Sequence, residues 1–133
     1  MKMNSKTPDF TYIPGSCNIG KGEIRRRQLV ALAGLLFTIS TLITLSTFDA
    51  SLQIRAGIFF PIFVTAIGFV QSRSKFCLAY GLAGTFNIGR LGDIQRVASE
   101  QDRQADRVTA LKILGKSFLL ALLATAVVLV LPF

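Results

Sequence analysis

The side chains best suited to chemistry in this sequence are its two cysteines, Cys17 and Cys77. Both belong to glycine-rich stretches, and a lysine lies close to each, Lys21 to Cys17 and Lys75 to Cys77. Nearby positive charge and a helix N-terminus lower a thiol pKa, which a sulfur-carrying or redox cysteine requires. Free cysteine is also a common buried residue that packs as a small hydrophobe. The sequence leaves both interpretations open.

Histidine is absent, so the commonest ligand for haem, chlorophyll, zinc and copper is missing. Two cysteines cannot complete a four-thiolate metal site. The usual general base is missing as well, and no nucleophile–base pair is visible. We therefore predict a protein that is not an enzyme and holds no metal and no cofactor.

The segment from Gly15 to Lys21 fits the G-x-x-x-x-G-K part of a phosphate-binding loop. Gly22 follows it, however, where the hydroxyl that ligates magnesium would be required. No parallel sheet is expected either, so we predict no nucleotide binding.

Three uncharged stretches dominate the rest of the chain, which has a mean hydropathy of +0.54. We predict transmembrane helices at about 28–48, 55–72 and 115–132, since about twenty apolar residues cross a bilayer core. Pro61 predicts a kink in the second. The 15 basic residues, against 7 acidic ones, cluster at the ends of these stretches, which favours a membrane surface over nucleic acid.

The predicted fold class is an all-α integral membrane protein with three transmembrane helices. Residues 1–17 are expected to form a cytoplasmic arm, and 18–133 a single membrane domain. Within that domain, 73–114 should contain a connector and an amphipathic cytoplasmic helix that is continuous with the third span. The short 47–51 segment predicts a tight turn between antiparallel neighbours.

One short pattern occurs twice, as Asn18-Ile19-Gly20 before the first span and as Asn87-Ile88-Gly89 after the second. We predict that the first copy begins the first helix and that the second begins a long helix at about Asp93. Together with polar residues close to the spans, they define a predicted interfacial motif: Asn18, Gly20, Glu23, Arg27, Tyr80, Gly84, Asn87 and Gly89.

Charges of both signs mark one face of the predicted amphipathic helix. Such a face is either simply solvated or the docking surface for a partner protein. The candidate docking residues are Arg96, Glu100, Arg103, Asp106 and Arg107.

The region 18–84 resembles a small, largely uncharacterised bacterial inner-membrane family that also occurs as the two-helix membrane tail of certain rhodanese sulfurtransferases. Its members show an Asn-Val-Gly-like motif with an acidic and a basic residue before helix one, and Cys-Pro-Leu-Tyr-x-x-x-Gly after helix two. Leu78 stands where the family has proline. The matching residues are Asn18, Gly20, Glu23 and Arg27, then Cys77, Tyr80, Leu82 and Gly84.

Every lysine and arginine except Arg55 lies in 1–27 or 73–116. The positive-inside rule then predicts a multi-pass protein of the cell inner membrane, with its N-terminus in the cytoplasm and its C-terminus outside. The spans carry small and hydroxyl residues but no central charge, which favours helix packing over ion transport. We predict an accessory or assembly subunit of a larger membrane complex, or a homo-oligomer. A thiol-based sulfur-transfer or redox component using Cys77 and an oligomeric solute channel are the alternatives.

Overall fold

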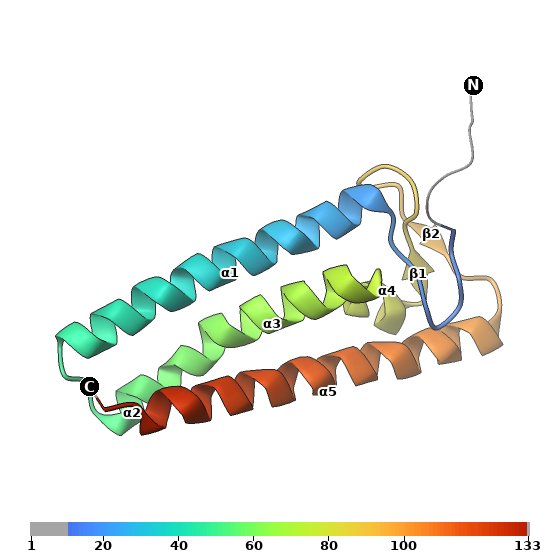
Figure 1. Ribbon diagram of the computed structural model, residues 1–133. Coiled ribbons are helices and arrows are strands. Elements are labelled where there is room, and N and C mark those ends of the chain that lie inside the picture. Colours follow the sequence, from blue (N-terminus) through green and yellow to red (C-terminus); the bar gives the residue numbers. More distant parts are fainter. Residues whose placement is uncertain (1–10, 133) are drawn as a thin grey trace.

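Three long helices run side by side in the computed structural model, which describes residues 11–132 (Figure 1). They are α1 (Lys21–Thr47), α3 (Phe59–Ser74) and α5 (Glu100–Val130). Helix α3 lies between the other two and packs against both. The segments Lys21–Thr47, Leu52–Ser74 and Glu100–Val130 are each long and apolar enough to cross a membrane. This confirms the prediction of a largely helical chain with three candidate spans.

The second span is irregular just before Pro61, the residue for which a kink is predicted. Helix α2 (Leu52–Arg55) passes through the 3-10 turn η1 (Ala56–Ile58) into α3. Pro61 is the third residue of α3, where a missing N–H removes no helical hydrogen bond, so the proline is accommodated in the first turn. The tight turn before α2 places Asp49 in the left-handed region, with φ 52°.

Small residues bring α1 and α3 close together. A Cβ atom on Gly68 would lie 2.8 Å from the backbone nitrogen of Ala31, and one on Gly34 would lie 2.9 Å from that of Thr65. Side chains at these two positions would force the helices apart. Gly68 and Ala121 are buried, in line with the predicted use of small residues for packing.

A small cap covers one end of the bundle. It contains α4 (Leu78–Ala83) and two strands, β1 (Thr85–Phe86) and β2 (Gln95–Arg96), which pair antiparallel. The prediction that the long helix begins near Asp93 is therefore wrong, and two short strands are added to the predicted helices. Gly92 turns the chain back with φ 86°, and β2 pairs with β1 before a helix can start.

Helix α5 begins at Glu100, where the hydroxyl of Ser99 accepts a hydrogen bond from the backbone N–H of Asp102. It continues to Val130 without interruption at Gly115. One stripe of α5 faces the rest of the molecule: Asp106, Ala110, Ile113, Ser117, Ala121, Thr125 and Val128. The spacing of three or four residues between them is that of one helix face.

The predicted N-terminal arm is described from residue 11 onward. Residues 1–10 lie outside the described residues, whereas 11–17 fold back over the cap. The ring of Tyr12 stacks on that of Phe86 with 4.4 Å between centroids. The backbone N–H groups of Ser16 and Cys17 both donate to the carbonyl of Ile13, so this part of the arm forms a tight turn.

Candidate functional site

The two copies of the Asn-Ile-Gly pattern lie beside each other in the cap. Ile19 and Asn87 form a parallel bridge, in which Gly20 N–H donates to the Asn87 carbonyl at 2.9 Å. Asn87 N–H donates in turn to the carbonyl of Asn18 at 2.9 Å. A Cβ atom on Gly20 would lie 2.1 Å from the carbonyl oxygen of Ile88, so this approach requires glycine. The repeat joins two distant segments. The first copy also begins α1, whose N-cap is Gly20, as predicted, whereas no helix begins at the second copy.

Asn18 fixes the position of Cys77. Its side-chain Oδ1 accepts from Cys77 N–H at 2.7 Å, and its Nδ2 donates to the Cys77 carbonyl at 3.1 Å. Gln71, near the end of α3, accepts from the N–H of Leu78 at 2.9 Å. These bonds satisfy backbone groups at the start of α4 and hold it against α1 and α3.

Glu23 is the centre of a buried polar network. Its side chain is fully buried and accepts hydrogen bonds from Arg27 Nη1 at 2.7 Å, Tyr80 Oη at 2.6 Å and Asn87 Nδ2 at 3.2 Å. These donors come from α1, α4 and the second Asn-Ile-Gly copy. A buried carboxylate needs such partners, because an unpaired buried charge is strongly destabilising.

Arg27 connects this network to the thiol of Cys77. Its Nη1 binds Glu23, while its Nη2 lies 2.8 Å from Cys77 Sγ. The guanidinium carbon also lies 5.8 Å from the ring centre of Tyr80. The sulfur of Cys77 thus accepts a hydrogen bond from a guanidinium, and the chemistry open to such a site is that of a nucleophilic or redox cysteine.

Cys17 has different surroundings. Its Sγ donates to the carbonyl of Ile19 at 3.6 Å, and burial raises the pKa of this thiol, although the Ile19 contact and Lys75 oppose that effect. Both cysteines are free. The geometry of Cys17 fits a packed small hydrophobe, and that of Cys77 fits the thiol interpretation better.

A second buried carboxylate, Asp106, holds the N-terminal segment. Its Oδ2 accepts from Tyr12 Oη at 2.7 Å and its Oδ1 from Gly15 N–H at 2.7 Å. Thr109 Oγ1 completes the link by donating to the Gly15 carbonyl at 2.7 Å. Asp106 is fully buried, so its prediction as an exposed docking residue is wrong.

The other candidate docking residues are divided between two environments. Arg96, Glu100 and Arg107 are exposed. Arg103 is partly buried and donates to the carbonyls of Val97 at 2.7 Å and Ala98 at 3.1 Å, as well as to Glu100. Arg103 thus ties the start of α5 to the cap.

Both tyrosines are held in their neutral form. Burial, the hydrogen bond to Glu23 and the charge of that carboxylate together raise the pKa of Tyr80 to about 12. Burial and the bond to Asp106 raise the pKa of Tyr12 above its usual value as well. Each phenol is therefore a hydrogen-bond donor at neutral pH rather than an acid.

The structure brings together Asn18, Gly20, Glu23, Arg27, Tyr80 and Asn87 from the predicted motif. The other two members shape the chain: Gly84 ends α4 with φ 75°, and Gly89 leaves room for the side chain of Asp93. Sequence reasoning missed the roles of Gln71 and Tyr12. It also missed that Asp106 shares the buried stripe of α5, although its spacing to Ala110 and Ile113 indicates this.

Within residues 11–132, no three His, Cys, Asp or Glu side chains gather where they could hold a metal ion. No family model, curated protein or solved structure matches this chain.

Proposed function

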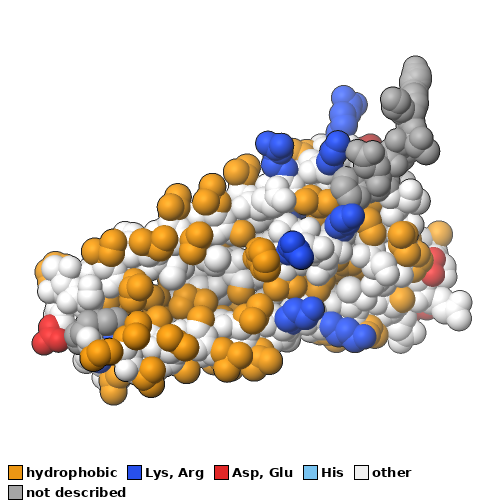
Figure 2. Space-filling view, viewed as in Figure 1, with side chains coloured by type: hydrophobic (Ala, Val, Ile, Leu, Met, Phe, Trp, Pro, Cys, Tyr) orange, Lys and Arg blue, Asp and Glu red, His pale blue; other side chains and the backbone are white. Residues whose placement is uncertain are grey.

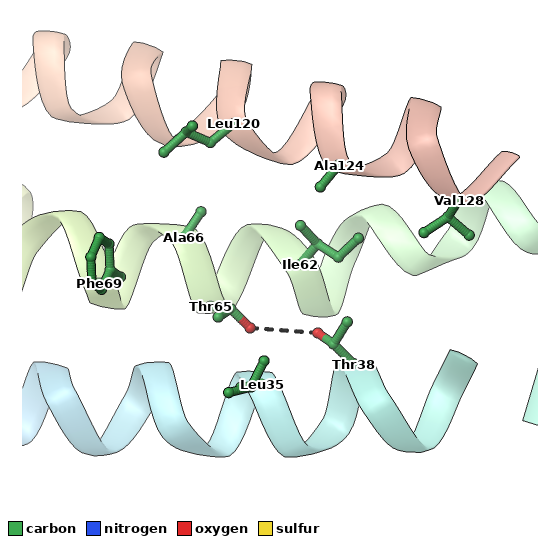
Figure 3. Close-up of a pocket in the computed structure, with 9 residues that line it drawn as sticks. All are labelled: Leu35, Thr38, Ile62, Thr65, Ala66, Phe69, Leu120, Ala124 and Val128. Atoms are coloured by element: carbon green, nitrogen blue, oxygen red, sulfur yellow. Dashed lines mark hydrogen bonds between the residues drawn. The ribbon is translucent and has the colours of Figure 1, made fainter. Parts of the chain in front are cut away.

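We propose that this chain is a non-enzymatic accessory or assembly subunit of a larger complex in the inner membrane of a bacterial cell. The observation that carries this proposal is an apolar groove between α1 and α5, with α3 as its floor (Figure 3). Its volume is about 470 Å³. The residues that line it are Leu35, Thr38, Ile62, Thr65, Ala66, Phe69, Leu120, Ala124 and Val128.

The occupant that suits this groove is one transmembrane helix of a partner protein. Ala66 and Ala124 are small, and small residues allow a helix backbone to approach closely. The hydroxyls of Thr38 and Thr65 face each other across 3.5 Å, after donating to carbonyls within their own helices. Their oxygens can still accept a hydrogen bond, which the side chain of a partner helix can supply and a lipid tail cannot.

Two alanines on α5 provide a matched test. The Ala124→Phe variant fills the groove, whereas Ala126→Phe adds the same ring to an exposed position outside it. After mild extraction from native membranes, we expect wild type and Ala126→Phe to copurify with the same membrane protein in a fixed ratio. The Ala124→Phe variant should no longer copurify with that membrane protein. Equal retention by both variants would exclude the groove as the binding surface.

The mass of the extracted particle distinguishes a foreign partner from self-association. A particle that contains only copies of this chain, and that Ala124→Phe dissociates, would replace the accessory-subunit proposal with a homo-oligomer. A lone wild-type monomer in several mild detergents would contradict both.

A second candidate function is thiol-based sulfur transfer or redox chemistry at Cys77, favoured by the 2.8 Å contact with Arg27. In sulfur transfer, the Cys77 thiolate attacks the outer sulfur of a donor persulfide, which forms a Cys77 persulfide and releases the donor thiolate. We expect Cys17→Ser protein, in which Cys77 is the remaining cysteine, to alkylate and acquire persulfide faster than Cys77→Ser protein near pH 7. Equal, slow reaction of both variants would exclude this function.

A further inference from the structure

A polar pocket lies beside Cys77, on a different surface from the helix-binding groove. Its volume is about 350 Å³, and it opens between α1, α3 and the start of α4. Arg26, Arg27 and Gln71 supply polar groups to its lining, and Val30, Ile67 and Leu78 supply apolar ones. The pocket therefore offers a charged part and a hydrophobic part to a single ligand.

An apolar groove follows the polar pocket along the same seam between α1 and α3. It has a volume of about 290 Å³ and includes Ala33 and Phe37 of α1 and Phe60 and Val64 of α3. On α1, positions 26, 30, 33 and 37 recur every three or four residues, and on α3 so do positions 71, 67, 64 and 60. Each set is one helix face, so pocket and groove are in line over about 15 Å.

The polar pocket lies at the boundary of the apolar surface. Figure 2 shows lysine and arginine side chains gathered toward the capped end of the molecule, next to a surface that is largely hydrophobic over the rest of the bundle. Arg25, Arg26 and Arg27 directly precede the uncharged part of α1. In a bilayer, this level is that of the lipid headgroups.

The charge of the pocket suits a phosphate group. Arg27 is largely buried and paired with Glu23, whereas the Arg26 side chain is 60% exposed and its closest approach to Glu23 is a long 3.6 Å. A guanidinium can bind phosphate oxygens in a bidentate manner. Arg26 can thus turn toward a headgroup phosphate without breaking the buried network.

We propose that this seam binds one anionic phospholipid, with its phosphate in the Arg26 pocket and an acyl chain in the groove that follows. The polar part alone would accept any phosphate, and the apolar part alone would accept any lipid. Their alignment at helical spacing selects a molecule that has both. This inference is independent of the proposed partner helix, which occupies the other groove.

The test compares retained lipid by native mass spectrometry of the full chain in detergent with equal amounts of phosphatidylglycerol and phosphatidylcholine. Wild type should retain phosphatidylglycerol preferentially. Arg26→Gln should reduce that preference about tenfold, because one charge-assisted contact is lost. Arg25→Gln makes the same charge change outside the pocket and should largely keep the preference. Circular dichroism checks that both variants fold.

A second variant tests the acyl-chain groove without changing charge. Ala33→Phe fills the groove and should reduce retention of both lipids, whereas Ala126→Phe on α5 should not. No preference in wild type, equal effects of Arg25→Gln and Arg26→Gln, or equal effects of the two phenylalanine variants would each overturn the proposal. Displacement of phosphatidylglycerol by millimolar inorganic phosphate, with Ala33→Phe unaffected, would identify free phosphate as the ligand instead.

Discussion

The side chain of Glu23 connects α1, α4 and the Asn87 segment. Replacing it with alanine leaves the largely buried guanidinium of Arg27 without its carboxylate and removes the acceptor of Tyr80 Oη. We expect the free energy of unfolding to fall by about 3 kcal/mol or more, as for other broken buried ion pairs. Denaturation in mixed detergent micelles, followed by circular dichroism, measures it.

The pair Glu100–Arg103, whose carboxylate is exposed, has the same 2.7 Å nitrogen–oxygen distance and serves as the control. Glu100→Ala should change stability much less, since solvent screens an exposed pair. If Glu23→Ala and Glu100→Ala lower the free energy of unfolding by similar amounts, the buried network stabilises the protein no more than the surface pair does.

The raised pKa of Tyr80 predicts how the stability of the protein changes at alkaline pH. Tyr80 has a pKa raised to about 12, against about 10 in an unfolded chain, so folding favours its neutral form. Its contribution to stability is complete below about pH 10 and is lost as the pH rises through the folded-state pKa. With no tryptophan present, tyrosinate absorbance near 295 nm reports on the phenols alone. In a Tyr12→Phe variant at pH 11, the folded protein should show little tyrosinate and the denatured protein much more; equal signals would contradict the buried bond to Glu23.

The side chains of the site could be predicted only in part from the sequence. Glu23 and Arg27 stand four residues apart before a hydrophobic span, and that spacing indicates a pair on one helix face. Their link to Cys77 and Tyr80 depends on how the second span returns to the same end of the bundle. No local pattern specifies that arrangement, so the partners of Arg27 became visible only in the structure.

At the scale of elements, the close packing of α1 on α3 depends on glycine. Gly68→Ala places a Cβ atom 2.8 Å from Ala31 N and 2.9 Å from Arg27 O, and backbone atoms cannot move aside easily. We expect a loss of roughly 1–3 kcal/mol in the free energy of unfolding, as for other overpacked sites. The same micelle denaturation experiment measures it.

Gly115→Ala is the matched control within α5, because nothing lies within 4 Å of the added Cβ atom. Alanine is the better helix former, so this variant should be unchanged or more stable by up to about 1 kcal/mol. A Gly68→Ala variant as stable as Gly115→Ala would mean that α1 and α3 do not pack as described.

The long helices and the cap differ in how well the sequence predicts them. An uncharged stretch of about twenty residues specifies a membrane-length helix by itself, which is why all three candidate spans were found. The segment from Asn87 to Ser99 has no such local determinant. Its strand pairs with Thr85–Phe86 and its first residue pairs with Ile19, so its structure depends on contacts between distant parts of the chain.

At the scale of the whole molecule, the three-helix bundle has two grooves that are lined by different kinds of side chain. The groove between α1 and α5 is almost purely apolar, while the α1–α3 seam has arginines at its capped end. This division follows from the central position of α3, which leaves the outer helices apart (Figure 1). The proposed partner helix and the proposed phospholipid would therefore occupy separate surfaces without competing.

The orientation in the membrane gives the last prediction. The start of α1, the end of α3 and the start of α5 share the capped end, and the α1–α2 turn lies at the opposite end with the end of α5 (Figure 1). Since most of the described lysines and arginines gather toward the capped end (Figure 2), we expect that end in the cytoplasm. Two exposed glutamines, Gln53 and Gln101, mark the opposite ends, and cysteine replaces each in turn. A membrane-impermeant maleimide should label Gln53→Cys from the outer side of intact inner membranes, and Gln101→Cys only after the membrane is opened. Wild-type protein, whose own cysteines are buried, gives the background. The reverse pattern would invert the topology, and would place the proposed phospholipid site in the outer leaflet.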